Sequence, residues 1–241
     1  MRTLVIGDIH SGFKALEQVL QRAAVSKKDK LIFLGDYVDG WSQAVETVDF
    51  LIELEKTHNC IYIRGNHDEL CSDWLVKGVD NPMWMQHGGA LSMASYKKAN
   101  KDTIARHIRF FERLKNYYLD ADNRLYLHAG FTNVKGVEHE YYPKLFYWDR
   151  TLWELALSLN PLLQEEDQNY PKRLLHYKEI YIGHTPVTRL GKTTPQKAAN
   201  VWNIDTGAAF MGPLSLIDVT TKEVWQSDGV HTLYPGEAGR N

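Results

Sequence analysis

The sequence predicts an α+β protein in which short buried strands alternate with helices. Runs rich in Ile, Leu, Val and Tyr recur along the chain, and Gly, Asp, Asn or His follows each of them. Such runs, bounded by turn residues, are typical of buried strands. Between the early runs, apolar residues recur at helical spacing. The order strand, helix, strand predicts βαβ units with right-handed crossovers.

Six runs supply the expected strands, and polar side chains follow each one. In chain order they are TLVIGDIH from residue 3, LIFLGDYVD from 31, CIYIRGNHD from 60, RLYLHAG from 124, IYIGHTP from 180 and VWNIDTG from 201. In sheets of this kind, ligands bind outside the carboxyl ends of the strands. We therefore expect the polar residues to converge at one shared edge and to form a site there.

The helical spacing is clearest in residues 13–24 and 42–56, where apolar residues recur every three or four positions. Residues 152–159 predict a short helix, whereas residues 133–148 predict a long loop. Residues 204–225 alternate and turn like an antiparallel hairpin.

Residues 68–114 differ from the rest because their pattern is mostly helical, with a glycine pair at 88–89. We interpret this segment as a helical cap or rim inserted into a single domain that spans residues 1–241, since no linker separates two domains. His107 lies in an arginine-bearing part of the segment, and we expect it at the surface.

The composition argues against several classes of protein. The chain has 241 residues, of which 44% are hydrophobic and 24% are charged, as in a globular protein with a core. The net charge of −2 and the lack of a basic stripe argue against a nucleic-acid partner. No apolar stretch is long enough for a membrane helix or a signal peptide. With Cys60 and Cys71 as its only cysteines, expected as reduced thiols, the sequence predicts a cytoplasmic protein.

The polar residues at the strand ends form a set of possible metal ligands. They are Asp8, His10, Asp36, Asp39, Asn66, His67, His128 and His184. Carboxylate and imidazole groups without a thiol suit Mn, Fe or Zn better than a soft metal. Each residue taken alone is more often packed or hydrogen-bonded than a ligand. Their occurrence in order at successive strand ends favours a metal site.

Five short blocks give the chain a resemblance to a known family. The blocks are GDIH at residue 7, GDYVDG at 35, GNHD at 65, HAG at 128 and GHTP at 183. They resemble the signature blocks of the calcineurin-like metallophosphoesterases, and the likeness extends to about residue 219. WDR at 148–150 and IDTGAAFMGPLSLIDV at 204–219 are similar to one branch in particular. That branch contains the bacterial and phage-lambda-type serine/threonine protein phosphatases and relatives that cleave dinucleoside polyphosphates.

The resemblance implies a fold, a cofactor and a set of residue roles. The implied fold is the αββα metallo-dependent phosphatase fold, a two-sheet β-sandwich flanked by helices. The implied cofactor is a pair of divalent metal ions, Mn, Fe or Zn, with Mn the first choice for activity. Six residues would hold these ions: Asp8 and His10 the first, Asn66, His128 and His184 the second, and Asp36 both. His67 would be the catalytic histidine, with Asp39 behind it.

The chemistry of phosphate hydrolysis suits these roles. Two divalent ions ~3.5–4 Å apart repel each other, and a shared carboxylate such as Asp36 reduces the repulsion. The ions would lower the pKa of the water between them, and the resulting hydroxide would attack phosphorus directly. His67 would give a proton to the leaving alkoxide as general acid, a role typically worth ~10²–10⁴-fold. Asp39 would fix the tautomer of His67 and favour its charged form.

One position departs from the family pattern. In the protein phosphatases the second block usually reads GDxVDRG, and its arginine contacts the substrate phosphate. Here Gly40 stands in place of that arginine, so a bidentate contact is lost. Arg150 of WDR matches a second phosphate-contacting arginine, and we expect it to bind the substrate. The alternative for Arg150 is an ordinary surface charge.

These inferences lead to a metal-dependent phosphomonoesterase that acts on phosphoserine or phosphothreonine in proteins, or on a phosphorylated small molecule. The first alternative is a hydrolase of dinucleoside polyphosphates such as diadenosine tetraphosphate, because it would use the same metals. The second is a non-catalytic metal-binding scaffold, although the chain retains every proposed ligand and His67. No membrane or nucleic-acid partner is expected.

Other polar and aromatic residues carry weaker expectations. Asp205 and Thr206 lie at a strand end, and we expect them to support the site. At least two of Trp84, Trp148 and Trp153 are expected to be buried core residues rather than stacking surfaces for a nucleobase.

Overall fold

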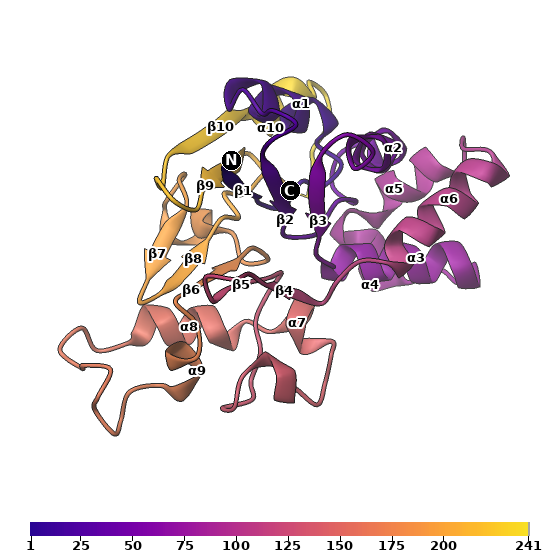
Figure 1. Ribbon diagram of the computed structural model, residues 1–241. Coiled ribbons are helices and arrows are strands. Elements are labelled where there is room, and N and C mark those ends of the chain that lie inside the picture. The colour runs from indigo at the N-terminus through magenta and orange to yellow at the C-terminus, as the bar shows by residue number, and fades with distance from the viewer. Residues whose placement is uncertain (241) are drawn as a thin grey trace.

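Two five-stranded β-sheets form the middle of the molecule, and helices lie against their outer faces (Figure 1). The structure is a computed structural model, and it describes residues 1–240. The two-sheet sandwich flanked by helices that the resemblance implies is therefore confirmed.

The first sheet contains three parallel strands and an antiparallel hairpin. Its strands are β1 (Thr3–Ile6), β2 (Lys30–Phe33), β3 (Asn59–Tyr62), β9 (Pro213–Asp218) and β10 (Val224–Gly229). Their spatial order is β10-β9-β1-β2-β3. β1, β2 and β3 are parallel, whereas β9 is antiparallel to both of its neighbours. The hairpin predicted near the end of the chain is thus confirmed as β9 and β10.

The second sheet also combines three parallel strands with antiparallel ones. Its strands are β4 (Tyr117–Leu119), β5 (Arg124–Leu127), β6 (Glu179–Ile182), β7 (Gln196–Ala198) and β8 (Val201–Asn203). Their spatial order is β4-β5-β6-β8-β7. β5, β6 and β8 are parallel, and β4 and β7 are antiparallel strands at the two edges.

All six predicted runs form strands, but they divide between the two sheets. β1, β2 and β3 lie in the first sheet, and β5, β6 and β8 lie in the second. The expectation of a single shared sheet edge was therefore wrong. A short apolar run does not indicate which sheet it joins, because the strand that pairs with it can be far away in sequence. Leu4 of β1, for example, pairs with Asp218 of β9.

Three layers of buried side chains hold the sheets and helices together. Val5, Ile32 and Tyr126 lie in the layer between the two sheets. Their sequence neighbours, such as Leu4 and Leu125, lie in the two outer layers, under the helices. Successive residues of a strand point to opposite faces of its sheet. Both faces are buried here, which explains why the strands read as continuous apolar runs.

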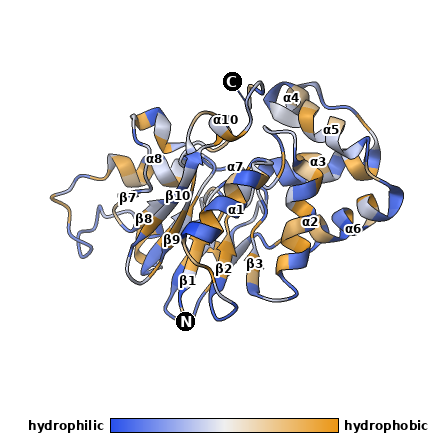
Figure 2. Cartoon of the chain, turned by 90° about the horizontal axis from the view of Figure 1, so that it is seen from above, coloured by the Kyte–Doolittle hydropathy of each residue, from blue (hydrophilic) through white to orange (hydrophobic). Residues whose placement is uncertain are grey.

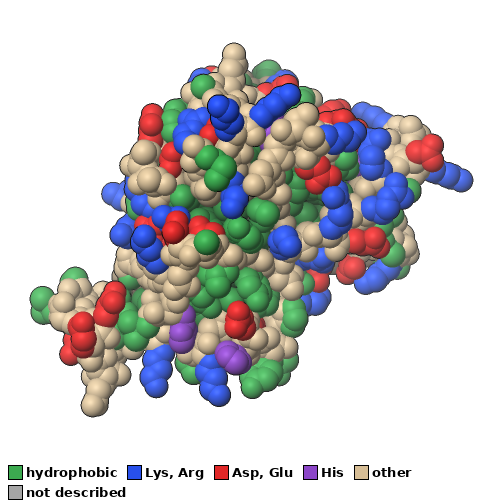
Figure 3. All heavy atoms as spheres, in the orientation of Figure 1, with side chains coloured by type: hydrophobic (Ala, Val, Ile, Leu, Met, Phe, Trp, Pro, Cys, Tyr) green, Lys and Arg blue, Asp and Glu red, His purple; other side chains and the backbone are tan. Residues whose placement is uncertain are grey.

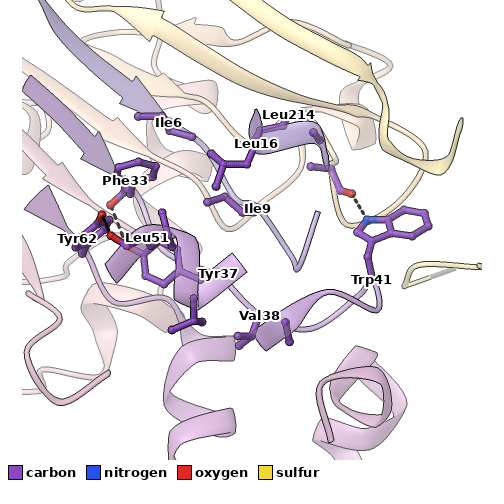
Figure 4. Close-up of a cluster of buried hydrophobic side chains, with 14 of the residues drawn as sticks. Ile6, Ile9, Leu16, Phe33, Tyr37, Val38, Trp41, Leu51, Tyr62 and Leu214 are labelled. Atoms are coloured by element: carbon purple, nitrogen blue, oxygen red, sulfur yellow. Dashed lines mark hydrogen bonds between the residues drawn. The ribbon is translucent and has the colours of Figure 1, made fainter. Parts of the chain in front are cut away.

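Helices α1 (Phe13–Arg22) and α2 (Ala44–Leu54) pack on the first sheet. The buried residues of α1 include Leu16 and Val19, which lie three positions apart on one helical face. Figure 2 shows the hydrophobic strands β1 and β2 beside α1. Figure 4 shows side chains of the strands, of α1 and of the loop after β2 meeting in this outer core. The short helix α10 (Val230–Leu233) follows β10 and contacts α1.

The outer face of the second sheet is covered by α7 (Leu145–Trp148), α8 (Thr151–Ser158) and α9 (Lys172–Leu175). The predicted short helix is confirmed as α8. Residues 133–148 run mostly as the predicted loop, although a short helical turn and α7 interrupt it. The connection between α8 and α9 extends away from the sheets at the lower left of Figures 1 and 3. Acidic side chains lie on this protruding lobe (Figure 3).

The segment that follows β3 is almost entirely helical and lies at the right of Figure 1. It consists of α3 (Asn66–Lys77), α4 (Pro82–Trp84), an irregular turn η1 (Met85–Gly89), α5 (Ala90–Tyr96) and α6 (Lys101–Glu112). α5 packs on α2, and α6 packs on α3. The segment is thus attached to the first sheet in two places: α5 packs on α2, and α3 begins shortly after β3.

His107 is not at the surface, contrary to the sequence-based expectation. It is fully buried in α6. Its Nδ1 lies 2.9 Å from the hydroxyl of Tyr96, and its Nε2 lies 2.7 Å from a carboxylate oxygen of Asp49. His107 lies three and four positions before Phe110 and Phe111, so it belongs to the inner face of the helix. The arginines nearby obscured this periodicity.

The surface visible in Figure 3 is mixed in charge, with Lys and Arg interspersed among Asp and Glu. No helix within residues 1–240 combines the length and the apolar character that crossing a bilayer requires.

Candidate metal centre

The residues that follow the strands of both sheets converge on one cavity of about 380 Å³. His10 follows β1, Asp36 follows β2, and His184 follows β6. Asn66 and His67, which open α3 after β3, line the same cavity. The carboxyl ends of strands from two sheets therefore supply one site, as the sandwich arrangement allows.

Two groups of potential ligand atoms share a single residue, Asp36. One group consists of His10, Asp36 and His67, and the other of Asp36, His128 and His184. Within each group the ligand atoms lie within 4.8 Å of one another, and every residue is buried. Asp36 Oδ2 lies 3.4 Å from Nε2 of His10 and 3.4 Å from Nε2 of His128. One carboxylate thus lies between two histidine clusters.

Backbone carbonyl groups orient two of the histidines. Nδ1 of His10 donates to the carbonyl oxygen of Asp39 at 3.0 Å. Nδ1 of His128 donates to the carbonyl oxygen of Leu34 at 2.8 Å. These bonds leave the Nε2 atoms of both rings directed at Asp36. A ring oriented in this way turns its other nitrogen toward the position that a metal would occupy.

Asn66 adds a neutral oxygen to the second group. Its Oδ1 lies 2.9 Å from Nδ1 of His184 and 3.2 Å from Nε2 of His128. Asn66 is placed there by Gly65, which precedes α3 and packs against Asp36. A Cβ at Gly65 would collide with the carboxylate and backbone of Asp36. Glycine is therefore required for the close approach of these two segments.

Asp8 lies beside the two groups but belongs to neither of them. It is buried, and its Oδ2 accepts a hydrogen bond of 2.9 Å from the backbone N–H of His184. Its Oδ1 has no hydrogen-bond partner among the described residues. Burial, with Asp205 as the next cause, raises the pKa of Asp8 well above its usual range. Nε2 of His184 is likewise buried without a partner in the described chain. Unpartnered polar atoms of this kind are what a cation site requires.

His67 and Asp39 form a tight pair beside the first group. Nδ1 of His67 donates to Oδ2 of Asp39 at 2.7 Å. The backbone N–H of His67 donates to Oδ1 of Asp36 at 3.0 Å, which places the ring next to the shared carboxylate. The rings of His10 and His67 meet edge to face, with centroids 5.0 Å apart.

Trp84 makes a contact at the site that the sequence analysis did not predict. Its indole N–H donates to the same Oδ2 of Asp39 at 2.6 Å, and the side chain is fully buried. Trp153 is also buried, so the expectation that at least two of the three tryptophans belong to the core is confirmed. Trp148 is partly exposed and lines the cavity.

Asp68, the last residue of GNHD, also escaped the sequence analysis. Its carboxylate accepts hydrogen bonds from the backbone N–H groups of Asp36, Tyr37 and Gly65 at 2.8 to 2.9 Å. Asp68 therefore ties the loop after β2 to the start of α3. An acidic residue three positions after a helix N-cap is a recognisable capping signal that could have identified it.

The backbone at the site is strained. His10, Asp36, Asp39 and His184 all have positive φ angles, of 51°, 53°, 68° and 68°. Residues other than glycine rarely adopt this conformation, and its cost is about 1–3 kcal/mol each. Strain of this kind persists where the surrounding structure enforces it, and it clusters at functional sites.

Buried charges in the site are balanced against one another. Burial lowers the pKa of His128, but Asp36 and Asp8 more than offset this and raise it to about 10. The pKa of Asp36 is well below its usual range, because His128 and His67 outweigh the opposing effect of burial. Burial lowers the pKa of His10 and His184 well below the usual range. His10 and His184 are therefore neutral, as a divalent cation requires of imidazole ligands, whereas His128 and Asp8 would give up their protons when a cation binds.

Arg150 lies at the rim of the cavity, where it is exposed. Its Nη1 donates to the hydroxyl of Thr185 at 3.0 Å. Partial burial, together with the charges of Arg189 and Arg240, lowers its pKa. The preceding Asp149 has a different function: it caps the start of α8 by accepting from the backbone N–H groups of residues 151 and 152.

The side chains of Asp205 and Thr206, which are adjacent in sequence, lie in different surroundings. Asp205 lines the cavity, and burial raises its pKa to about 6. Thr206 faces away, because its hydroxyl donates to the carbonyl oxygen of Pro213 at 2.7 Å. The donor set as a whole, with oxygen and imidazole atoms, a shared carboxylate and two unpartnered buried atoms, fits divalent cations of the Mn, Fe or Zn type.

The chain matches proteins of known sequence over most of its length. It is 27% identical over 229 residues to the asymmetrical bis(5'-nucleosyl)-tetraphosphatase PrpE of Anoxybacillus flavithermus, and the match covers 88% of each chain. It is 26% identical over 218 residues to serine/threonine-protein phosphatase 1 of Salmonella typhimurium, covering 88% of this chain and 89% of that relative.

Solved structures share the fold. One, provisionally described as a diadenosine tetraphosphatase, aligns with a TM-score of 0.64 at 18% identity, over 95% of this chain and 93% of the other. A serine/threonine phosphatase from Saccharomyces cerevisiae aligns with a TM-score of 0.59 at 16% identity, over 95% and 80%. Residues 1–208 match the family model for calcineurin-like phosphoesterases. The resemblance seen in the five sequence blocks is confirmed, and this chain belongs to the calcineurin-like phosphoesterase family.

Proposed function

We propose that the protein is a phosphomonoesterase that depends on two divalent metal ions and acts on phosphoserine or phosphothreonine in proteins. The observation that carries this proposal is the position of Asp36. Its carboxylate belongs to both groups of potential ligands, and the His67–Asp39 pair lies directly beside it.

The ligands divide between two positions. His10 and the buried, unpartnered carboxylate of Asp8 would hold one ion, and Asn66, His128 and His184 the other, with Asp36 between them. When bound, the ions supply positive charge against the phosphate oxygens and a water molecule acidic enough to act as nucleophile. Burial of the ligands keeps bulk water away and strengthens these electrostatic contacts.

His67 would protonate the leaving oxygen of serine or threonine. An alkoxide is a poor leaving group, and a positioned general acid typically contributes ~10²–10⁴-fold. Asp39 accepts from Nδ1 of His67, so the proton to be donated resides on Nε2.

Arg150 would hold the substrate phosphate at the rim of the cavity. A guanidinium group donates two parallel hydrogen bonds to phosphate oxygens. Within residues 1–240 the side chain of Arg150 makes one hydrogen bond, to Thr185, and its remaining N–H groups are available to a substrate in the cavity that it lines.

A hydrolase of dinucleoside polyphosphates is a second candidate. The similarity to PrpE favours it, and so does the presence of three arginines, Arg150, Arg189 and Arg240, around one cavity. Several phosphates in a chain would engage more positive charges than one phosphoserine does.

The experiment is a substrate panel combined with metal analysis. The purified protein is loaded with Mn²⁺, Fe²⁺ or Zn²⁺ and assayed on para-nitrophenyl phosphate, a phosphoserine peptide and diadenosine tetraphosphate. Turnover of the phosphopeptide with about two metal ions per chain supports the proposal. Turnover of the dinucleotide alone favours the second candidate. If the metal-loaded protein hydrolyses none of the three substrates, it is a binding scaffold and the proposal is wrong.

A further inference from the structure

Arg240 brings a positive charge to the cavity from a segment outside the residues that match the family model. Its side chain lines the cavity together with the candidate ligands. A Cβ built at Gly40 would lie 3.5 Å from Cγ of Arg240. The stem of Arg240 therefore lies beside the position at which the protein phosphatases carry an arginine.

The backbone explains why residue 40 is not itself an arginine. Gly40 has a φ of +112°, which side chains other than glycine rarely adopt. Its N–H donates to the carbonyl oxygen of Gly88 at 3.4 Å. A Cβ at Gly88 would lie 3.1 Å from Cγ of Arg240 and only 2.7 Å from the nitrogen of Gly40. The two glycines thus let the loop after β2, the turn η1 and Arg240 approach one another closely.

Specific hydrogen bonds hold the segment that carries Arg240. Glu237 accepts from the backbone N–H of Ser42 at 3.0 Å and from its hydroxyl at 2.7 Å. The backbone N–H of Arg240 donates to the carbonyl oxygen of Ala209 at 2.9 Å. Arg240 is therefore held in place by the hydrogen bonds of Glu237, which precedes it, and by the hydrogen bond of its own backbone N–H.

A buried aromatic pair adds to this anchorage. Trp41, which directly follows Gly40, stacks on Tyr234 with ring centroids 5.3 Å apart. The indole N–H of Trp41 donates to the carbonyl oxygen of Ala208 at 2.7 Å (Figure 4). Gly239 packs on the same indole, where a Cβ would lie 2.8 Å from the ring. Figure 2 shows the end of the chain at the edge of the molecule that carries α4 and α10.

The charged group of Arg240 is only partly engaged by protein atoms. Its guanidinium lies 5.4 Å above the ring of Phe210. Its Nε is buried and has no hydrogen-bond partner within residues 1–240. Packing on Phe210 accounts for the position of the stem, but it leaves a buried N–H donor unsatisfied, which is costly unless an acceptor binds there.

We propose that Arg240 binds an oxygen of the substrate phosphate and thereby replaces the arginine that is absent at Gly40. The inference rests on the proposed function and extends it, because it assigns phosphate binding to a residue beyond the matched range 1–208. The guanidinium would act together with Arg150, which lines the same cavity. A phosphate dianion between the two arginines relieves their mutual repulsion.

The test compares phosphate binding by the wild-type protein and Arg240→Met, which keeps the aliphatic stem and removes the charge. Inorganic phosphate is titrated into each manganese-loaded protein by isothermal calorimetry. We expect Arg240→Met to bind phosphate about tenfold or more weakly, since a hydrogen bond to a charged group is lost. Its manganese content should be unchanged, and KM should rise more than kcat falls. Arg240→Lys should lie between the two proteins.

Arg22→Met is the matched control, because Arg22 pairs with Asp228 on the surface. It should bind phosphate like the wild type. If Arg240→Met binds phosphate within twofold of the wild type, the role of Arg240 is refuted, while the proposed function stands. If the wild-type protein with manganese binds no phosphate and hydrolyses no phosphate ester, both proposals are refuted.

Glu237→Gln tests whether the anchored segment positions Arg240. The substitution weakens the contacts to Ser42 and leaves the guanidinium present. Phosphate binding should weaken in the same direction as in Arg240→Met, but less. In the double variant, Glu237→Gln should add little to Arg240→Met, because its effect passes through the same arginine. Fully additive losses would contradict this coupling.

Discussion

The indole N–H of Trp84 and the Nδ1–H of His67 donate to the same carboxylate oxygen, Oδ2 of Asp39, at 2.6 and 2.7 Å. Trp84 comes from the helical segment after β3, whereas Asp39 follows β2. The helical segment is therefore connected to the proposed acid through a hydrogen bond as well as through packing. Its conformation bears directly on the orientation of His67.

Trp84→Phe should lower kcat for alkyl phosphates by about 3- to 10-fold, because the Asp39 carboxylate loses one of the two donors that it has within residues 1–240. Metal content should not change. The measurement is kcat on a phosphoserine peptide and on para-nitrophenyl phosphate. Trp74→Phe is the control, since Trp74 contacts Trp84 but has no bond to Asp39. Similar losses in both variants would show that packing matters here and the hydrogen bond does not.

Asp36→Asn should abolish metal binding and hydrolysis together. The carboxylate lies between two ligand groups, so the substitution removes both a shared ligand and a negative charge. Elemental analysis should show less than one metal ion per chain, with activity reduced by about 10³-fold or more, given that metal and acid-base contributions are lost jointly. A variant that retains its full metal content would identify another residue as the shared ligand.

His67→Asn should keep the metals and slow alkyl phosphates far more than aryl phosphates. A phenolate leaves without much protonation, whereas a serine alkoxide needs a proton from His67. The expected loss is ~10²–10⁴-fold on a phosphoserine peptide and much less on para-nitrophenyl phosphate. The ratio of the two rates is the measurement. Equal losses on both substrates are incompatible with a general acid.

Gly183→Ala should displace Asp8 while leaving the fold intact. A Cβ at position 183 would collide with Oδ1 of Asp8, the buried oxygen that has no partner in the described chain. Affinity for one of the two metal ions should fall by about tenfold or more. Metal titration measures this. Gly191→Ala is the control, because no atom of the described residues lies within 4 Å of a Cβ built there, although the φ of +68° strains the backbone of this variant.

Asp29→Asn should destabilise the fold in a pH-dependent way. Asp29 accepts from Arg2 at 2.7 Å and from Ser26 at 2.9 Å, and these contacts lower the pKa of Asp29 well below its usual value. The ionised carboxylate of Asp29 therefore stabilises the folded state at pH above about 4, and this stabilisation is lost as the pH falls further. In urea unfolding, the free energy of unfolding of the variant should be about 1–3 kcal/mol below that of the wild type at pH 7. The difference should be smaller at pH 3.

The comparison for Asp29 is Asp228→Asn, which removes an exposed pair with Arg22. Exposed ion pairs contribute little, so this variant should unfold like the wild type at both pH values. If Asp29→Asn lowers the free energy of unfolding by the same amount at pH 7 and pH 3, the charge of the Asp29 carboxylate is not the cause.

The strands and the polar residues after them could be predicted from local sequence, because buried β runs and turn residues are local signals. Asp8, Asp36 and His184 were found in this way. The division into two sheets could not be read from the residues alone. Pairing between β1 and β9 depends on the whole topology, and only the family resemblance pointed to it.

Residues that act through distant contacts were missed. Trp84 and Arg240 lie in no recognisable block, and each reaches the site from a segment that is remote in sequence. Asp68 and His107 did carry local signals, one at a helix start and the other on an apolar helical face. The roles of Trp84 and Arg240 therefore could not be predicted from the sequence, because both depend on long-range contacts.

The anchored segment of residues 234–240 has a practical consequence for work on this protein. An affinity tag attached close to this segment would lie near the cavity that Arg240 lines. At the other end of the chain, Met1 is 93% exposed and lies at the opposite edge of the molecule (Figure 2). Purification tags belong there, because a tag close to Arg240 would obstruct access to the cavity.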